Sequence, residues 1–282
     1  MKKLLFKTVS FLTFFIPTKW LIKLSGKKVI YPFYHIVSDN TPAHIKHLYP
    51  VKTIKQFEKD LDFLQKHFTA SVFPPKGKKS LFVLSFDDGL KEIYDIVAPI
   101  LKKRNIPAII FINTSFVDNK GIFDNYISSL KKENPEIDIK KYLKNNNPYL
   151  TKQQILQLKT EGFTVGAHGV THPLFADITE REQINQVKES INFVNEIFGE
   201  KQKLFAFPFS DYGVKDTFFE TIFSEKIADY TFGTAGIKND IFKKNIQRIP
   251  IEKYGLSAKR HIKTDCLLYI LKKIIGKEYV KR

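Results

Sequence analysis

The chain has very little cysteine: Cys266 is the only one among 282 residues. A single cysteine excludes an intrachain disulfide framework and any cysteine-rich zinc module. The sequence also lacks a run of about 20 apolar residues, which a membrane-spanning helix would need. No internal repeat or low-complexity tract suggests several domains, and 43% hydrophobic residues are enough for the core of one α/β barrel. We therefore expect one folded domain with extensions at its ends.

Acidic residues are outnumbered, with 29 Asp and Glu against 46 Lys and Arg, so the formal net charge is +17. The lysines gather at both ends of the chain, among large apolar residues such as Phe14, Trp20 and Ile274. We predict a basic amphipathic segment at 1–27 and a basic amphipathic helix at 259–282. Lysines mixed with large apolar side chains are typical of helices that lie on an anionic membrane surface.

Three interpretations compete for the N-terminal segment. The first is an interfacial helix at an anionic membrane, and the second is an uncleaved or unusual signal peptide, because no small-residue cleavage site follows Thr18. The third is a helix that caps the barrel with help from residues such as Leu271. We expect membrane association at the cytoplasmic face, with export to the cell envelope as the alternative. Nucleic acid is not an expected partner because no nucleic-acid motif is present, and nothing indicates an oligomeric state.

Helical and strand-like segments alternate along the chain. A threonine followed three positions later by Gln or Glu predicts a helix start, and this pattern occurs at Thr53, Thr151 and Thr179. Short apolar runs predict buried strands, and they lie at 81–84, 108–112, 163–167, 204–209 and 230–234. Such alternation predicts a parallel sheet covered by helices. A polar insertion at 118–150, with short helices near Tyr126, is expected on the rim.

Two aspartates follow the first of these runs. Asp87 and Asp88 stand before Gly89, which allows a sharp turn towards the next helix. Neighbouring side chains at a strand end point in different directions, so one carboxylate can bind a metal while the other takes a proton from water. Taken alone, Asp-Asp-Gly is commonly a simple turn.

Two histidines follow another strand-like run, with His168 at its end and His172 four residues later. Two imidazoles and one carboxylate make a three-ligand site with open positions, the arrangement of catalytic metal sites. A lone His-x-x-x-His is commonly accidental. Both motifs, however, end strands at the edge where α/β active sites are built. Together they predict a hydrolytic metal site.

These motifs resemble those of the polysaccharide deacetylases with the NodB homology domain, carbohydrate esterase family 4. The family's Thr/Ser-Phe-Asp-Asp-Gly motif is matched by 85–89, and its His-Ser/Thr-x-x-His motif by 168–172, with Gly169 in place of the hydroxyl residue. The resemblance implies a distorted (β/α)7 barrel of the NodB type over residues 28–258. It also implies one divalent metal ion, with zinc expected. The roles implied are those of Asp87 as catalytic base and of Asp88, His168 and His172 as metal ligands.

The third family motif, Arg-x-Pro-Tyr/Phe, is incomplete. It stands here as Ala206-Phe207-Pro208-Phe209, so the arginine that orients the base in the family is missing. Pro208 and Phe209 remain as substrate-binding and oxyanion candidates. The backbone N–H of Phe209 is able to stabilise an oxyanion, because that task needs a fixed donor and no particular side chain.

The last family motif, Leu-x-x-Leu-His, which supplies the general acid, is absent after 248–251. Instead, His35 ends a strand-like run at 29–34. This is similar to a circularly permuted branch that includes poly-β-1,6-N-acetylglucosamine deacetylases, in which the acid-bearing strand has moved to the N-terminus. We predict His35 as the general acid, since an unperturbed histidine pKa of about 6.5 suits that role. A histidine that only hydrogen-bonds at a strand end is the alternative, and His261 is the other candidate acid.

The resemblance implies a hydrolase that removes acetyl groups from an N-acetylated glycan or a lipid-linked sugar, using a metal-bound water and Asp87. Two alternatives stay open. One is an O-acetyl esterase. The other is a non-catalytic or weakly active, membrane-associated glycan-binding relative, whose base is misoriented for want of the third-motif arginine.

Overall fold

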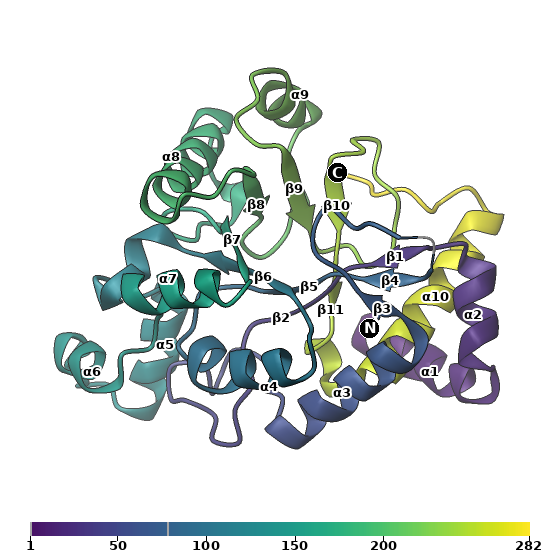
Figure 1. Ribbon diagram of the computed structural model, residues 1–282, viewed down its shortest axis with the longest axis horizontal. Coiled ribbons are helices and arrows are strands. Elements are labelled where there is room, and N and C mark those ends of the chain that lie inside the picture. The colour runs from purple at the N-terminus through teal and green to yellow at the C-terminus, as the bar shows by residue number, and fades with distance from the viewer. Residues whose placement is uncertain (1, 78) are drawn as a thin grey trace.

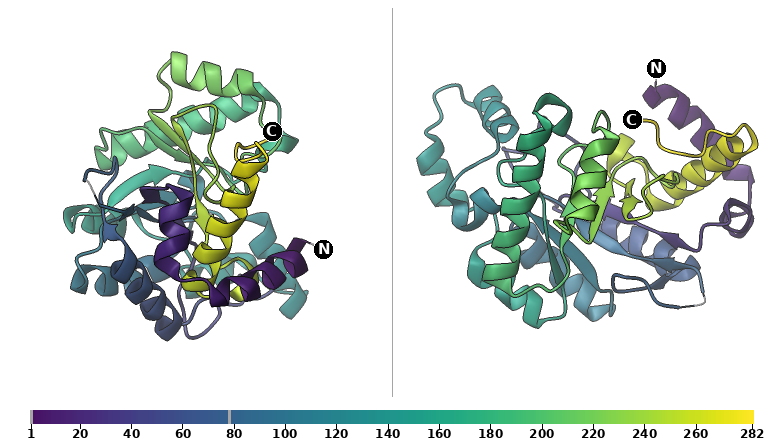
Figure 2. Two further views of the ribbon diagram at one scale, coloured as in Figure 1. Left: turned by 90° about the vertical axis from the view of Figure 1, so that its right-hand side faces the viewer. Right: turned by 90° about the horizontal axis from the view of Figure 1, so that it is seen from above.

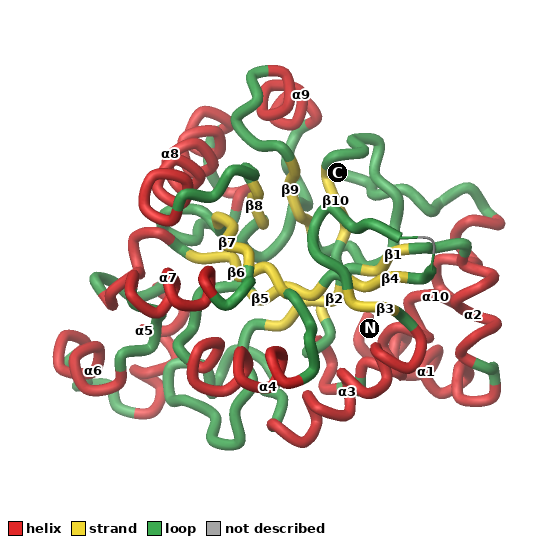
Figure 3. Tube along the Cα trace, viewed as in Figure 1, coloured by secondary structure: helices red, strands yellow, loops and turns green. Residues whose placement is uncertain are grey.

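The computed structural model describes residues 2–77 and 79–282, except for the side chains of Lys2, Lys3 and Leu5. Met1, where the predicted N-terminal segment starts, lies outside the described residues. Strands occupy the centre of the molecule and helices surround them (Figures 1 and 3). The strands are β1 (Val29–Ile30), β2 (Pro32–Tyr34), β3 (Thr69–Ala70), β4 (Leu81–Phe82), β5 (Leu84–Phe86), β6 (Ala108–Ile112), β7 (Thr164–Ala167), β8 (Leu204–Ala206), β9 (Tyr230–Gly233), β10 (Asn245–Gln247) and β11 (Ile249–Pro250).

The helices follow the strands in regular alternation over most of the chain. The α-helices are α1 (Lys2–Leu12), α2 (Thr18–Ser25), α3 (Ile54–His67), α4 (Ala98–Lys103), α5 (Asp124–Glu133), α6 (Ile139–Asn146), α7 (Lys152–Thr160), α8 (Glu180–Phe198), α9 (Asp216–Ser224) and α10 (Ala258–Ile274). Shorter helical turns are η1 (Thr13–Phe15), η2 (Ile93–Val97), η3 (Thr114–Asn119), η4 (Phe175–Asp177) and η5 (Lys253–Gly255).

One chain segment closes the sheet on itself. β10 and β11 are consecutive and only Arg248 separates them, yet β10 pairs with β9 whereas β11 pairs with β2. These are the two ends of an eight-stranded order, β10-β9-β8-β7-β6-β5-β2-β11, in which all neighbours are parallel. Residues 245–250 therefore act as one strand with a neighbour on either side. The predicted parallel barrel covered by helices is confirmed.

Two further strands are split in the same way. Tyr31 separates β1 from β2, and Val83 separates β4 from β5. β1 and β4 pair with each other, and β4 also pairs with β3 in a three-stranded sheet. When each split pair is counted once, the described residues place seven strand segments around the ring. This confirms the distorted (β/α)7 barrel, and the distortion lies at these breaks.

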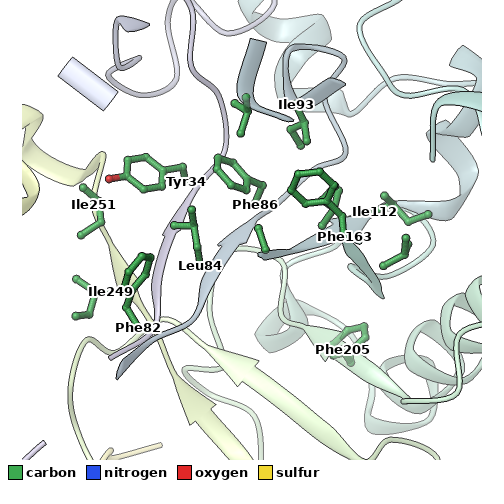
Figure 4. Packing of buried hydrophobic residues seen from close by; sticks show 14 of the residues in the cluster. Tyr34, Phe82, Leu84, Phe86, Ile93, Ile112, Phe163, Phe205, Ile249 and Ile251 are labelled. Atoms are coloured by element: carbon green, nitrogen blue, oxygen red, sulfur yellow. The ribbon is translucent and has the colours of Figure 1, made fainter. Parts of the chain in front are cut away.

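Both faces of the strands are buried, as the continuous apolar runs predicted. Leu84 and Phe86 of β5 point to the layer beneath the helices, where Ile93 and Ile112 meet them (Figure 4). Phe111, next to Ile112 in β6, belongs to a second buried cluster on the other face of the sheet. The alternation along β6 thus divides the core into a layer under the helices and a barrel interior.

Local sequence signals located the helix starts well. All three predicted capping boxes form, at Thr53, Thr151 and Thr179. Each threonine side chain accepts a hydrogen bond from the backbone of the third helical residue, whose own side chain bonds back to the threonine N–H. The helix predicted near Tyr126 is α5.

Two predicted boundaries were wrong. The strand predicted over 204–209 ends at Ala206, because Pro208 has no N–H to donate and Phe209 adopts a left-handed φ of 57°. The helix predicted over 259–282 ends at Ile274, and Gly276 takes a left-handed φ of 64° just beyond it.

The N-terminal helices lie against the C-terminal one. In the left view of Figure 2, the purple helices α1 and α2 and the yellow helix α10 share the side that faces the viewer. Within residues 2–77 and 79–282, no helix combines the length and the apolar character that crossing a membrane requires.

A buried ion pair fixes helix α3 to the start of α10. The Lys52 ammonium lies 3.0 Å from Asp60 Oδ2, and both side chains are buried. Asp60 also accepts a hydrogen bond of 2.6 Å from the backbone N–H of Ala258. Lys52 in turn donates to the carbonyl oxygen of Leu256 at 2.6 Å. These contacts join two segments that are nearly 200 residues apart in the sequence.

We predict that Asp60→Ala lowers the free energy of unfolding by about 3–5 kcal/mol, because the Lys52 charge would stay buried without an opposite charge. Asp62 on the same helix is the matched control, since its carboxylate is mostly exposed where it pairs with Arg104. Asp62→Ala should cost less than about 1 kcal/mol. Urea denaturation measures both, and equal losses would contradict a special role for the buried pair.

Candidate active site

Asp87 and Asp88 follow β5 directly, at the carboxyl edge of the barrel. Both are buried, and Asp88 has a left-handed φ of 70°. His172 and Phe209, which lie in the loops after β7 and β8, also adopt left-handed φ values, of 62° and 57°. This conformation is costly for residues other than glycine and tends to gather at functional sites. Three loops thus carry strained backbone at one edge of the barrel.

Arg248 holds the Asp87 carboxylate with two hydrogen bonds. Nη1 donates to Oδ1 at 2.6 Å and Nη2 donates to Oδ2 at 2.8 Å. The guanidinium is 1% exposed and also packs over the ring of Phe33, 4.3 Å from its centroid. Burial by itself would raise the pKa of Asp87, but the Arg248 charge lowers it below its usual value. Asp87 is therefore an oriented, ionised carboxylate.

Asp88, His168 and His172 come together as predicted. Their potential ligand atoms all lie within 4.8 Å of one another. The Nε2 atoms of His168 and His172 stand 3.4 Å and 3.2 Å from the same oxygen, Asp88 Oδ1.

These residues fit a cation. The His168 Nδ1 lies 2.8 Å from the carbonyl oxygen of Ala206, so it carries the proton and leaves Nε2 with its lone pair towards Asp88. Asp88 Oδ1 is buried and has no hydrogen-bond partner among the described residues. Burial lowers the pKa of His172, which favours the neutral ring that binds metals. These electron-pair donors converge on buried space and could hold a metal ion.

The polar insertion contributes to this site. Tyr126, on α5 within residues 118–150, donates a hydrogen bond of 2.6 Å to Asp88 Oδ2. The tyrosine ring is buried, and its hydroxyl also lies 3.2 Å from that of Tyr49. The bond occupies one carboxylate oxygen and leaves Oδ1 without a hydrogen-bond partner among the described residues. The insertion therefore braces Asp88 as well as forming part of the rim.

His35 stands at the end of β2 and pairs with Glu252. Its Nδ1 lies 2.8 Å from Glu252 Oε2, and the same carboxylate accepts bonds from the backbone N–H groups of His35 and Ile36. Burial by itself would lower the pKa of His35, but the hydrogen bond and the charge of Glu252 raise it to about 9. The predicted acid is thus held protonated, with Nε2 as its free nitrogen.

A cavity of about 450 Å³ connects these groups. Its lining includes the four residues Asp87, Asp88, His168 and His172, together with His35, Phe209 and Tyr254. The backbone N–H of Phe209 donates to no acceptor among the described residues, and its ring lies 4.8 Å from that of His172. Pro208 is buried and lies outside the lining of this cavity. His261 is also outside it, so the C-terminal candidate for the acid does not face this cavity.

Sequence reasoning missed three residues of this site. Arg248-Ile249-Pro250 repeats the Arg-x-Pro spacing of the third family motif on another strand, and this unused signal could have identified Arg248. Glu252 follows the same strand at its carboxyl end, where active-site groups gather. Tyr126 lies in a long polar insertion and carried no signal of its own.

Residues 75–219 match the model of a protein family described as polysaccharide deacetylase, which is just over half of the chain. Comparison with curated proteins gives no match.

Solved structures share the fold at low sequence identity. The deacetylase PplD from Streptococcus pyogenes has a TM-score of 0.63 at 18% identity, with 84% of this chain and 97% of that one covered. IcaB from Ammonifex degensii has a TM-score of 0.58 at 17% identity, with 83% and 97% covered. A de-N-acetylase from Aggregatibacter actinomycetemcomitans has a TM-score of 0.63 at 16% identity, with 83% and 99% covered.

We predict that His172→Ala abolishes stable binding of a divalent ion, because the described residues offer three ligands at this site and each of them matters. Tyr126→Phe should keep the ion but weaken its affinity roughly 10- to 100-fold, since the hydroxyl that orients Asp88 is lost. Metal titration followed by elemental analysis measures both. Tyr230→Phe, on β9, is the control, and an affinity for Tyr126→Phe equal to that of this control would contradict the bracing role.

Proposed function

The chain belongs to the polysaccharide deacetylase family and is a hydrolase of carbon–nitrogen bonds other than peptide bonds; on that premise, we propose that it deacetylates an N-acetylated glycan or lipid-linked sugar. The proposal includes dependence on one divalent ion, with zinc as the expected metal. The observation that carries it is the division between two neighbouring carboxylates. Asp87 is bound by Arg248, whereas Asp88 faces two histidines.

A divalent ion held by Asp88, His168 and His172 would polarise the acetyl carbonyl and make a water more acidic. Asp87 takes the proton of the attacking water, and Arg248 keeps this carboxylate ionised and aimed. The backbone N–H of Phe209 donates to the oxygen that becomes negatively charged when water adds to the carbonyl carbon. As the carbon–nitrogen bond breaks, His35 protonates the leaving amine. Acetate and a free amino sugar result.

Arg248 bears on the glycan-binding alternative. That alternative depends on the missing arginine at Ala206, which would leave the base without an orienting partner. Arg248 meets Asp87 through two short hydrogen bonds from the strand that closes the barrel. The arrangement at Asp87 therefore supports an active enzyme.

The test is acetate release from a panel of N-acetylated and O-acetylated glycans, with added zinc and with a chelator. Release from N-acetylated substrates that the chelator abolishes supports the proposal. Release from O-acetylated substrates alone would establish the esterase alternative, and no release from any substrate would favour the binding protein.

We predict that Asp87→Asn abolishes turnover while the protein keeps its metal. Asp88→Asn should lose the metal. Loss of a base removes proton transfer but not metal binding, whereas loss of a ligand weakens metal binding itself. Acetate release and metal content are measured on the same preparations. If Asp87→Asn kept most of the wild-type rate, Asp87 would not be the base.

We predict that His35→Ala slows amide hydrolysis about 10²- to 10⁴-fold with metal content intact. An activated ester, whose leaving group needs no proton, should react nearly as fast as with the wild type. Equal losses on both substrates would indicate a structural or binding role for His35.

The pH profile offers a related prediction. His35 donates only while it is protonated, so amide hydrolysis should fall as pH rises through about 9, where its pKa lies. Glu252→Gln removes the charge that raises this pKa, so the fall should begin at a lower pH. If the rate of Glu252→Gln fell at the same alkaline pH as that of the wild type, a group other than His35 would cause the fall.

A further inference from the structure

One side of the molecule exposes a concentration of large apolar side chains. They come from α1, η1, α2 and the end of α10, the elements that lie together in the left view of Figure 2. We call this surface the docking face. Its exposed apolar residues are Leu4, Phe11, Leu12, Phe14, Phe15, Trp20, Leu24, Leu271, Ile274 and Ile275. Phe14 and Ile274 are each 75% exposed, and Trp20 is 66% exposed.

In α1 and η1, polar side chains face the rest of the protein and large apolar side chains face outward. Ser10 and Thr13 are each 1% exposed, whereas Phe11, Phe14 and Phe15 face outward. Ser10 accepts a hydrogen bond of 3.1 Å from the Arg260 guanidinium of α10. Its hydroxyl therefore helps to hold α1 against α10. A helix that only capped the barrel would bury its phenylalanines. The outward apolar side therefore needs an apolar partner.

The charge around these residues indicates what that partner is. Residues 1–28 contain no Asp or Glu. Exposed basic residues on or next to the same elements include Lys7, Lys19, Lys23, Lys28, Lys259, Arg260, Lys273 and Lys277. Aromatic and aliphatic side chains interleaved with lysines match a bilayer whose lipid headgroups are anionic. We infer that the docking face binds an anionic membrane surface.

Helix α1, which carries part of the docking face, touches the rim of the active site from its inner side. The ring of Phe6 in α1 lies 4.8 Å from the ring of Tyr254. Tyr254 lines the catalytic cavity and adopts a left-handed φ of 70°. A bilayer on α1 would therefore lie beside the cavity mouth. This step rests on the proposed function. It identifies the substrate class as an acetylated sugar that a lipid anchors in the membrane.

Binding is tested with vesicles of phosphatidylcholine mixed with phosphatidylglycerol, and with vesicles of phosphatidylcholine alone. Trp20 is the only tryptophan in the chain, so its fluorescence reports on the docking face directly. We expect at least tenfold tighter binding to the anionic vesicles, with Trp20 emission shifted to shorter wavelength. Equal binding to both vesicles, or binding without a change in Trp20 emission, would overturn the proposal.

Charge variants test whether vesicle binding depends on the lysines of the docking face or only on the high net charge of the protein. The triple variant Lys7→Gln, Lys19→Gln, Lys23→Gln should weaken binding roughly a hundredfold, because each lysine near the surface contributes about 1 kcal/mol. The control is Lys131→Gln, Lys140→Gln, Lys144→Gln, which removes the same charge from exposed positions on α5 and α6, far from α10 in Figure 1. Equal losses in both triples would overturn the assignment.

The apolar part is tested with Phe14→Ser, Phe15→Ser, against the control Leu156→Ser, Ile197→Ser on α7 and α8. Only the first pair should weaken vesicle binding, and unchanged thermal midpoints would show that both variants fold. Self-association is measured without lipid by light scattering. A dimer that buries Trp20 would assign the face to a second copy of the chain and overturn the proposal.

Failure of this inference can be told from failure of the proposed function, because vesicle binding needs no catalysis. Acetate release from a soluble glycan without vesicle binding would overturn the docking face alone. Where both activities are present, the Phe14→Ser, Phe15→Ser variant should release acetate more slowly than the wild type from lipid-linked N-acetylglucosamine in vesicles, and as fast as the wild type from a soluble substrate. If the variant matched the wild type on both substrates, the substrate class would be overturned.

We propose the cytoplasmic leaflet as the location, and detection outside the cell membrane on fractionation would favour export.

Discussion

The bidentate ion pair between Arg248 and Asp87 is the interaction on which the rest of the site depends. Arg248 stands at the break between β10 and β11, where one strand leaves β9 and joins β2. Its guanidinium is buried against Phe33 and bonded to Asp87. A buried charge without its partner would cost about 3–5 kcal/mol. The ion pair therefore both stabilises the closed barrel and orients the Asp87 carboxylate.

Ring closure also explains how His35, which follows the N-terminal strand β2, comes to line the same cavity as the aspartates. β2 lies between β5, which leads to the aspartates, and β11, which leads to Glu252. In a closed ring the first and last strands are neighbours, so His35 meets Glu252 from the opposite end of the chain. Moving a strand from one terminus to the other changes the order along the chain and keeps the position in the ring.

The site combines rigid strand ends with strained loops. The carboxyl edges of β2, β5, β7 and β11 place its charged groups, while Asp88, His172 and Phe209 turn through left-handed backbone. Tyr126 adds a hydrogen bond from an insertion that shares no strand with the barrel. Electrostatic groups held in this way need little rearrangement when a substrate arrives, which is the property that favours catalysis.

The sequence by itself determined the elements and the pairs that lie close along the chain. The capping boxes, the apolar runs and the motifs at Asp87 and His168 are local, and each depends on residues within a few positions of one another. Only the tertiary structure decided that Arg248 bonds to Asp87, that Glu252 holds His35, and that the phenylalanines of η1 face outward. These contacts depend on which distant segments of the chain pack together, and the spacing of residues in the sequence does not show that. The closed ring of parallel strands brings those segments into contact.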